Sequence, residues 1–166
     1  MGYTHNTAMS QFIPPNACSF SAGTWTPTIT SDVPSLVRTA ADTDHTIIIP
    51  LNVPSNSAYR EGSCIATVDV FYKVATADLT AVTPKVEHVT LTADVAAVTG
   101  AEETAVTYSA IASARITQAS HTLTMTFTTP PWLSNADAYY LDILLDTGAS
   151  AVFTFLGARI NYTDRR

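Results

Sequence analysis

The fold class is decided by residues 121–162, HTLTMTFTTPPWLSNADAYYLDILLDTGASAVFTFLGARINY, which read as three consecutive β-strands. In residues 121–128, large apolar side chains alternate with threonines. That alternation is typical of a half-buried strand, because successive side chains of an extended chain point to opposite faces. Pro130-Pro131 ends the strand, since proline has no N–H to donate to a sheet. The alternation returns in residues 138–146, and a third strand is expected over residues 151–162.

The third strand changes phase in its middle. Phe153 and Phe155 lie in one phase, and from Ala158 onward the apolar residues lie in the other, with Gly157 at the change. A β-bulge at Gly157 would bring both sets onto one face. The alternative is a strand buried on both faces. Either way, the sequence predicts a packed β-sheet at the C-terminus.

The rest of the chain adds shorter strands. They are expected at residues 17–30 (one or two strands), 36–39, 45–53, 64–76, 85–93 and 104–116, the last being the weakest pattern. In residues 85–93, Val89 and Leu91 are expected to point inward. Residues 45–53 are expected to form an edge strand or to end early, because Pro50 and Pro54 interrupt them.

Eight or nine strands at this spacing predict a single β-sandwich of jelly-roll-like form. An extended N-terminal arm, residues 1–15, precedes the expected β-sandwich domain, residues 16–166. No internal repeat and no low-complexity tract is found in the sequence.

Composition agrees with an all-β class. Hydrophobic residues make up 46% and charged residues 13% of the chain, and the charged share is about half of the usual value. Threonine accounts for about one residue in six, and threonine and valine favour pleated, half-buried surfaces. The good helix formers Leu, Glu, Lys, Arg and Gln are scarce.

The low charge also bears on function. Surfaces of Thr, Ala and Ser suit repeated contacts between subunits, where charged side chains would cost desolvation energy. They also suit exported β-proteins. Both interpretations favour an assembly or surface protein over a cytosolic enzyme.

The charge balance argues against two partners. The net charge is −6, and the only basic cluster is Arg165-Arg166. Binding a nucleic-acid backbone takes several cations that replace counterions, so no nucleic-acid partner is expected. The longest apolar run, around residues 47–49, is far too short to cross a membrane as a helix, and residues 1–10 carry no apolar core of a secretory signal.

Two cysteines are too few for a disulfide framework. Cys18 and Cys64 are expected to be separate buried thiols, although a single disulfide between them remains an alternative. No CxxC motif occurs, which argues against a redox or zinc-ribbon site.

No pattern of catalytic, metal-binding or cofactor-binding residues emerges. Asp42-Thr43-Asp44-His45 is the densest metal-like cluster, but it lacks the spacing of a calcium loop and reads as turn residues before a strand. The four histidines are scattered without zinc-ligand spacing. Glu102-Glu103 and the pair Asp142 and Asp146 are candidate carboxylates for glycoside hydrolysis, although such positions more often form a solvated face. No cofactor is expected, and the chain is predicted not to be an enzyme.

Aromatic residues offer one possible ligand site. Trp132 follows Pro130-Pro131 in a loop, where it would present a flat apolar face to a sugar ring or plug the end of the sandwich. The other candidates for sugar stacking are Trp25, Tyr59, Tyr139 and Tyr140.

The N-terminal arm is the main candidate for subunit contacts. It has no periodicity, and it runs into a stiff joint because each proline fixes its own φ and biases the preceding residue to an extended conformation. The loops at residues 55–62 and 94–103 are further candidate contact regions. The contact residues expected are Tyr3, His5, Phe12, Ile13, Pro14, Pro15, Tyr59 and Arg60.

Four segments resemble small β-rich virion proteins of tailed phages. They are residues 25–27 (WTP), 63–72 (SCIATVDVFY), 130–133 (PPWL) and 155–162 (FLGARINY). The resemblance is one of style over most of the chain, and no family site residues are carried over. It implies a capsid decoration (cement) subunit or a short fibre, often trimeric.

The expected function is therefore structural. The chain is predicted to be a non-enzymatic virion subunit, a phage capsid decoration protein assembled in the host cytoplasm. Its expected partners are copies of itself, with a trimer favoured, and a major capsid or other virion protein. The alternatives are a carbohydrate- or receptor-binding module of a phage fibre or tail, and a subunit of an extracellular surface filament.

A glycan array separates the structural prediction from the receptor-binding alternative. A decoration subunit is expected to show no saturable binding to any sugar, because its contacts are with proteins. Saturable binding that is lost on Trp132→Ala would instead support the receptor-binding module.

Overall fold

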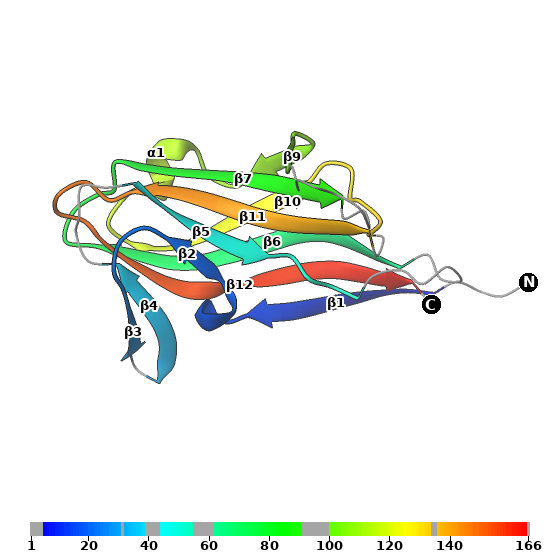
Figure 1. The fold of residues 1–166 in the computed structure, drawn as a ribbon, viewed down its shortest axis with the longest axis horizontal. Coiled ribbons are helices and arrows are strands. Elements are labelled where there is room, and N and C mark those ends of the chain that lie inside the picture. The colour runs from blue at the N-terminus through cyan, green and yellow to red at the C-terminus, as the bar shows by residue number, and fades with distance from the viewer. Residues whose placement is uncertain are drawn as a thin grey trace, which may run out of the picture.

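Among the described residues, twelve strands form two antiparallel sheets that pack face to face, which confirms the predicted all-β sandwich (Figure 1). The structure is a computed structural model that describes residues 5–30, 32–38, 44–54, 62–90, 100–133 and 136–165. The strands are β1 (Asn6–Ile13), β2 (Ser19–Ser21), β3 (Trp25–Thr30), β4 (Val33–Arg38), β5 (Asp44–Pro50), β6 (Ser63–Ala75), β7 (Ala81–Thr90), β8 (Ala101–Glu103), β9 (Val106–Tyr108), β10 (Ser120–Phe127), β11 (Asp137–Asp146) and β12 (Val152–Arg165).

The strand order is that of a jelly roll. Sheet A has the order β3-β4-β12-β6-β10-β9, with β1 also paired to β12, and sheet B has the order β2-β5-β11-β7-β8. The last strand, β12, returns between β4 and β6, and β11 returns between β5 and β7. Eight of the strands (β4 to β8 and β10 to β12) account for this double Greek key. The prediction of eight or nine strands covered the regions of β2, β3 and β9, but it missed β1, which was expected as an arm, and β8, which lies in a predicted loop.

The core lies between the sheets and is built by the alternation seen in the sequence. Leu123, Met125 and Phe127 of β10 face Leu141 and other inward residues of β11, and all are buried. Tyr72 of β6 stacks on the ring of Phe153 at a centroid distance of 5.1 Å. Burying each large apolar side chain is worth about 1.5–3 kcal/mol, so this layer dominates the stability of the sandwich.

β12 organises sheet A. It pairs with β6 on one side along most of its length, and on the other side first with β4 and then with β1. The register shifts between Phe155 and Gly157, and Gly157 has a φ of 119°. Phe155 and Ala158 are both fully buried, whereas Arg159 is exposed. The bulge interpretation of this strand is therefore confirmed, and a strand buried on both faces is excluded.

Two expectations about local structure were wrong. Residues 104–116 were expected to form a strand, but β9 is only three residues long and is followed by α1 (Ala112–Arg115). The extended run breaks at Ala110, which has a φ of 63°, and its carbonyl accepts a 2.9 Å hydrogen bond from Arg115 Nη2. This one-turn helix is the only α-helix among the described residues, and none of their helices is long and apolar enough to cross a membrane.

The second error concerns β7. The strand begins at Ala81 and continues through Pro84, and Val82 and Val86 are its valines that point into the core. Val89 was expected to point inward, but it lies on the outer face of sheet B near Gly100. The pattern misled because Val86 and Val89 differ by an odd number of positions, so only one of them can face the core. Leu91 lies outside the described residues.

The described part of the N-terminal arm is extended, as expected, and over Asn6–Ile13 it is a strand of sheet A. All of its eight residues pair with β12 of the same chain, from Asn6 opposite Arg165 to Ile13 opposite Ala158. Only Ile13 is buried. β1, which lies within the arm predicted for residues 1–15, is therefore a strand of the same sandwich that was predicted for residues 16–166.

Gly157→Ala is expected to loosen β1 selectively. A Cβ at Gly157 would lie 2.7 Å from the Ile13 carbonyl oxygen and 2.7 Å from the Phe12 ring, and the φ of 119° suits only glycine. The free energy of unfolding is expected to fall by about 1–3 kcal/mol. Hydrogen exchange is expected to accelerate in β1 more than elsewhere.

The matched control is Gly148→Ala. Gly148 also has a positive φ, of 56°, but its Cβ would approach the Thr80 hydroxyl at 3.0 Å, away from β1. This variant is expected to leave the exchange of β1 amides unchanged. Equal acceleration in β1 for the two variants would contradict the role assigned to Gly157.

Candidate contact surface

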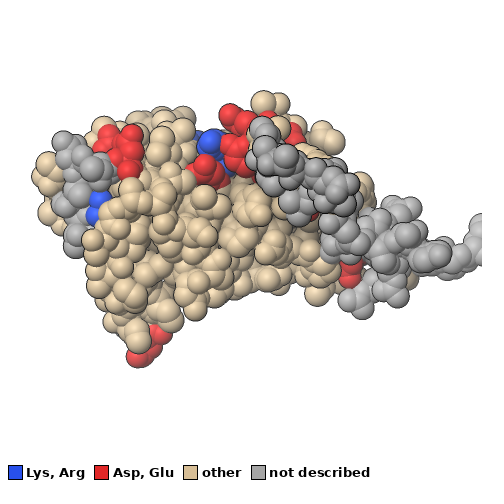
Figure 2. All heavy atoms as spheres, in the orientation of Figure 1, with Lys and Arg blue, Asp and Glu red and all other residues tan. Residues whose placement is uncertain are grey.

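Exposed apolar side chains concentrate on one part of the molecule. Seven large hydrophobic side chains of the described residues are exposed, and four of them, Met9, Phe12, Ile29 and Val33, lie on β1 and on the β3–β4 hairpin. The hairpin projects from the sandwich beside β1 and β12 (Figure 1). On the face drawn in Figure 2, charged residues form small groups and uncharged residues cover most of the remaining described surface.

An apolar groove lies between this hairpin and the end of β1. It has a volume of about 750 Å³. Its lining residues are Pro14, Pro15, Asn16, Cys18, Phe20, Pro27, Thr28, Ile29, Pro34, Ser35 and Leu36. They come from β2, β3, β4 and the short 3₁₀ helix η1 (Pro15–Ala17) with its flanking residues.

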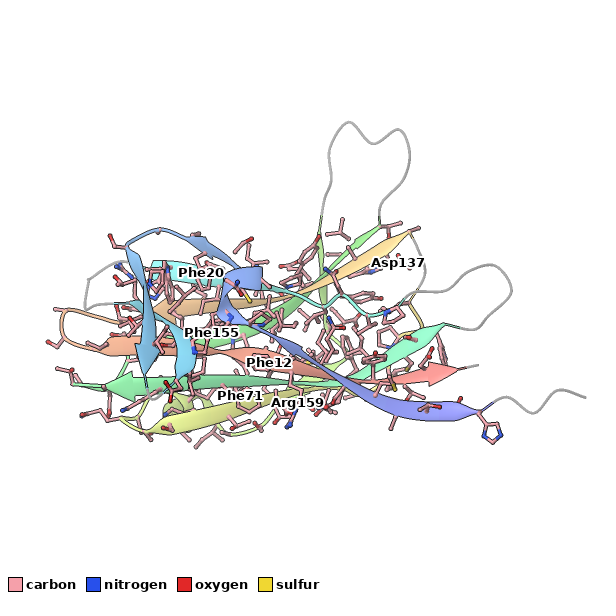
Figure 3. All side chains as sticks on the ribbon, turned by 90° about the horizontal axis from the view of Figure 1, so that it is seen from below. Phe12, Phe20, Phe71, Asp137, Phe155 and Arg159 are labelled. Carbon is pink, nitrogen blue, oxygen red and sulfur yellow. The ribbon has the colours of Figure 1, made fainter. Side chains whose placement is uncertain are left out.

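The walls of the groove are held by packing and local hydrogen bonds. Phe20 packs against Trp25 at a centroid distance of 4.6 Å and against Phe155 of the core at 6.0 Å (Figure 3). The Ser35 hydroxyl donates to the Thr28 carbonyl at 3.2 Å, which ties the two strands of the hairpin together. Four prolines line the groove, and each limits backbone freedom there. A fixed apolar groove of this kind suits burial against another surface.

The cysteine in the groove is not set up as a nucleophile. Cys18 and Cys64 are both free thiols, so the disulfide alternative is excluded in this structure, and both are partly buried where full burial was expected. Burial raises the pKa of Cys18 to about 12. The reactive form of cysteine is the thiolate, and little of it would exist at neutral pH.

The outer face of sheet A carries a row of cross-strand neighbours, three of which are polar. Phe12, Arg159, Asp69 and Thr124 are cross-strand neighbours on β1, β12, β6 and β10. Figure 3 shows Phe12, Arg159 and Phe71 along neighbouring strands, and the Arg159 guanidinium lies 5.6 Å from the centre of the Phe71 ring. The exposed arginine is thus set among aromatic rings, a combination enriched in protein interfaces.

Asp69 is the centre of this row. Its carboxylate accepts hydrogen bonds from the Thr124 hydroxyl at 2.8 Å, from Arg159 Nη2 at 3.0 Å and from Asn161 Nδ2 at 3.1 Å. Burial alone would raise the pKa of Asp69, but these hydrogen bonds and the charge of Arg159 outweigh burial and hold the pKa below its usual value. The carboxylate is a structural anion that positions Arg159.

A smaller hollow of about 440 Å³ lies on the outer face of sheet B. It is lined by Ile48, Glu87, Val89, Gly100, Tyr140 and Asp142. Lys85 Nζ bridges Glu87 at 2.8 Å and Asp142 at 3.4 Å. Burial raises the pKa of Asp142, although the charge of Lys85 opposes the shift. The carboxylates of the hollow are therefore already engaged by a lysine.

The carboxylates considered for glycoside hydrolysis have other contacts. Asp142 pairs with Lys85, and the Asp146 carboxylate accepts the Gly148 N–H at 2.9 Å in the turn after β11. The Glu103 carboxylate accepts the Ala105 N–H at 3.0 Å. These three candidate carboxylates therefore form structural contacts: Asp146 and Glu103 accept backbone hydrogen bonds, and Asp142 forms an ion pair on the surface of the sheet.

The histidines of the described strands are held by local contacts. His88 Nε2 lies 3.0 Å from the Asp137 carboxylate, and its ring stacks on Tyr139 at 4.5 Å. His121 Nε2 lies 2.7 Å from the Thr117 carbonyl oxygen. Both rings are therefore hydrogen-bonded to neighbouring groups of the protein.

The described residues of the Asp42–His45 cluster, Asp44 and His45, do not form a metal site. His45 is buried and packs edge-on against Trp25 at 5.3 Å, whereas Asp44 is exposed. Asp42 and Thr43 lie outside the described residues. Across the described ranges, no three His, Cys, Asp or Glu side chains come together as a metal site.

The predicted contact residues are only partly described. His5, Phe12 and Pro14 are exposed, with 55% of Phe12 accessible, whereas Ile13 and Pro15 are buried. The buried pair anchors the arm to the body, and the exposed residues border the groove or lie on β1. Tyr3, Tyr59 and Arg60 lie outside the described residues, as do most of the loops at residues 55–62 and 94–103.

The candidate aromatic residues separate into two groups. Trp132 is 47% exposed, and its backbone forms an isolated bridge with Cys64, so it does not plug the sandwich. Tyr140 faces outward and lines the hollow on sheet B. Trp25 and Tyr139 pack against other rings at or within the core. Tyr59 lies outside the described residues.

Sequence reasoning missed the groove. Its lining comes from segments up to 22 positions apart, Pro14 to Leu36, that meet only when the hairpin folds beside η1. The available signal was the density of prolines at positions 14, 15, 27 and 34 around the exposed Ile29. No protein family and no curated protein matches this chain.

Asp69→Asn is expected to lower stability in a pH-dependent way. Because the folded pKa of Asp69 lies below the unfolded value, its contribution is present above the ordinary pKa of about 4 and is lost as the pH falls through the folded value. The variant is expected to lose about 1–3 kcal/mol at pH 7 in urea unfolding, and less at pH 3.

Asp142→Asn is the control with the opposite sign. The folded pKa of Asp142 is raised, so ionisation of this group costs stability as the pH rises through it. Relative to the wild type, Asp142→Asn should gain stability between pH 3 and pH 7. A loss for Asp69→Asn that is the same at both pH values would refute the role of the ionised carboxylate.

Proposed function

We infer that this chain is a non-enzymatic structural subunit of a viral particle, a capsid decoration protein of the tailed-phage type. It works by burying an uncharged surface against its neighbours. Its partners are further copies of the chain and a major capsid or other virion protein, and its place is the virion.

One observation carries the proposal: the exposed apolar residues are concentrated around a groove on a surface poor in charge. Ile29 lines the groove, and the exposed Val33 precedes the groove residue Pro34, whereas Met9 and Phe12 are exposed on β1, which leads into Pro14 of the groove lining. Grouped exposed apolar side chains mark interaction sites more often than single ones do. The groove also lacks the ionic groups that would make its burial costly.

The fold supports the same proposal by analogy. Jelly rolls are used by viral capsid proteins, although also by lectins and other proteins, so the fold alone does not assign function. The carboxylates and histidines considered for chemistry engage neighbouring groups as described above. What distinguishes this chain is a surface suited to contact.

The mechanism is burial of area, repeated over many copies. A standard protein interface buries about 1,600 Å², and a few central apolar or aromatic residues supply most of its energy. Ile29 on one wall of the groove and the exposed Phe12 on β1 are candidates for that role. Many such contacts together would hold a shell against internal pressure.

A receptor-binding role is the second candidate, and the exposure of Trp132 favours it. The Trp132 side chain is 47% exposed near the start of β6, and an exposed aromatic ring is a suitable surface for stacking on a sugar. Hydrogen-bonding groups next to Trp132 would also be needed, since sugar sites combine a ring with convergent polar groups.

Ile29→Asp is expected to weaken assembly of the purified chain. Ile29 is 75% exposed and lines the groove, so a carboxylate there would have to be desolvated on contact. Self-association measured by sedimentation velocity is expected to weaken at least about tenfold, which corresponds to 1.4 kcal/mol.

Ile111→Asp is the matched control. Ile111 is 73% exposed, almost the same as Ile29, but it lies just before α1, outside the groove. This substitution is expected to leave self-association and thermal stability unchanged. A wild-type chain that stays monomeric at all concentrations, or equal effects of the two substitutions, would count against the proposed contact surface.

A further inference from the structure

We propose that β1 is an exchangeable strand: in the assembled protein, β1 of one copy pairs with β12 of a second copy in place of that copy's own β1. The inference deepens the proposed structural function, on which it rests, by naming the partner and the surface that the arm occupies. The exchange of β1 follows in four steps.

The first step is that β1 is held almost entirely by its main chain. Its described contacts are the antiparallel pairing with β12, and seven of its eight residues are exposed. Only Ile13 is buried, and the Phe12 ring packs over Gly157. A strand bound in this way depends little on the rest of its own molecule.

The second step is that the acceptor site on β12 is complete in every copy. Residues 158–165 of β12 pair with β1 along the edge that is not bonded to β6, and Gly157 leaves the space that the Phe12 ring fills. A second copy carries the same residues on its β12. The β1 strand of the first copy would therefore make the same hydrogen bonds and the same Phe12 ring contact with the second copy's β12. Exchange therefore loses no contact of the β1–β12 pair.

The third step concerns the connection. β1 ends at Ile13 and is followed by Pro14, which is exposed and extended with φ −72° and ψ 158°, and by Pro15 at the start of η1. Two successive prolines keep this joint stiff and extended. A stiff, extended joint resists the tight reversal that flexible linkers make easily, and exchange of an identical element is a low-cost route to association between copies.

The fourth step is electrostatic and concentration-dependent. Residues 6–12 carry no acidic or basic side chain, so the arm approaches a second copy without direct repulsion, although each chain has a net charge of −6. Within one molecule, however, the arm benefits from a high effective concentration. Exchange therefore needs subunits that are already held side by side, which is the task assigned to the apolar groove.

Two single-cysteine variants test the exchange directly. Ala8 on β1 lies opposite Thr163 on β12. In a background with Cys18→Ala and Cys64→Ala, Ala8→Cys and Thr163→Cys are made in separate chains, and the two chains are co-expressed. Neither chain can form an intramolecular disulfide. We expect mild oxidation to give a covalent heterodimer on a non-reducing gel, because exchange places the two thiols opposite each other.

Two controls make the result decisive. The double variant Ala8→Cys/Thr163→Cys must form its disulfide within one chain, which establishes that the pair has suitable geometry. If it does not, Ser10→Cys and Asn161→Cys replace this pair, and a short bismaleimide cross-linker replaces the oxidation. Co-expressed Thr67→Cys and Thr126→Cys chains carry partners on β6 and β10, which are both paired on two sides, and must stay unlinked.

The outcomes separate the inference from the function it rests on. A chain that self-associates but gives only intramolecular disulfides in the double variant, with no heterodimer in the mixture, overturns the exchange and leaves the structural function standing. A chain that remains monomeric and gives no heterodimer overturns both. A heterodimer at the yield of the Thr67 and Thr126 control reflects random collision and also overturns the exchange.

Discussion

The pairing of β12 along both of its edges is the constraint on which the rest of sheet A depends. β6 occupies one edge, and β4 and β1 share the other. The change from β4 to β1 coincides with the bulge at Gly157, where a φ of 119° lets Phe155 and Ala158 both point into the core. Without this bulge, one half of the strand would turn its apolar side chains to solvent.

The same bulge shapes the outer surface. Because no Cβ is present at Gly157, the Phe12 ring can lie over the backbone of β12 beside Arg159, which Asp69 positions from β6. Where β4 gives way to β1 along β12, the tip of the β3–β4 hairpin extends beyond the pairing with β12, and the apolar groove forms between the hairpin and η1. Packing inside the sandwich and the surface available for contact therefore share one cause.

Sequence patterns predicted the strands with strict alternation and failed where alternation was weak. The strands β6, β10, β11 and β12 and the bulge follow directly from period-two apolar residues. Residues 104–116 read as a strand on their apolar content alone, and the turn at Ala110 was invisible because alanine rarely adopts a positive φ. Of the predicted contact residues, Phe12 is exposed on β1 and Pro14 is exposed at the groove, whereas Ile13 is anchored in the core.

By itself, the sequence determined an all-β sandwich with a charge-poor surface, because side-chain alternation and composition are local properties that need no knowledge of neighbours in space. Only the tertiary structure decided that the N-terminal arm runs along β12 and that four prolines and Ile29 enclose a groove with Phe20. These features join residues far apart in the chain through hydrogen bonds and packing between sheet edges. Main-chain hydrogen bonds carry no residue-specific signal, so no pattern in the sequence could have assigned β1 to β12.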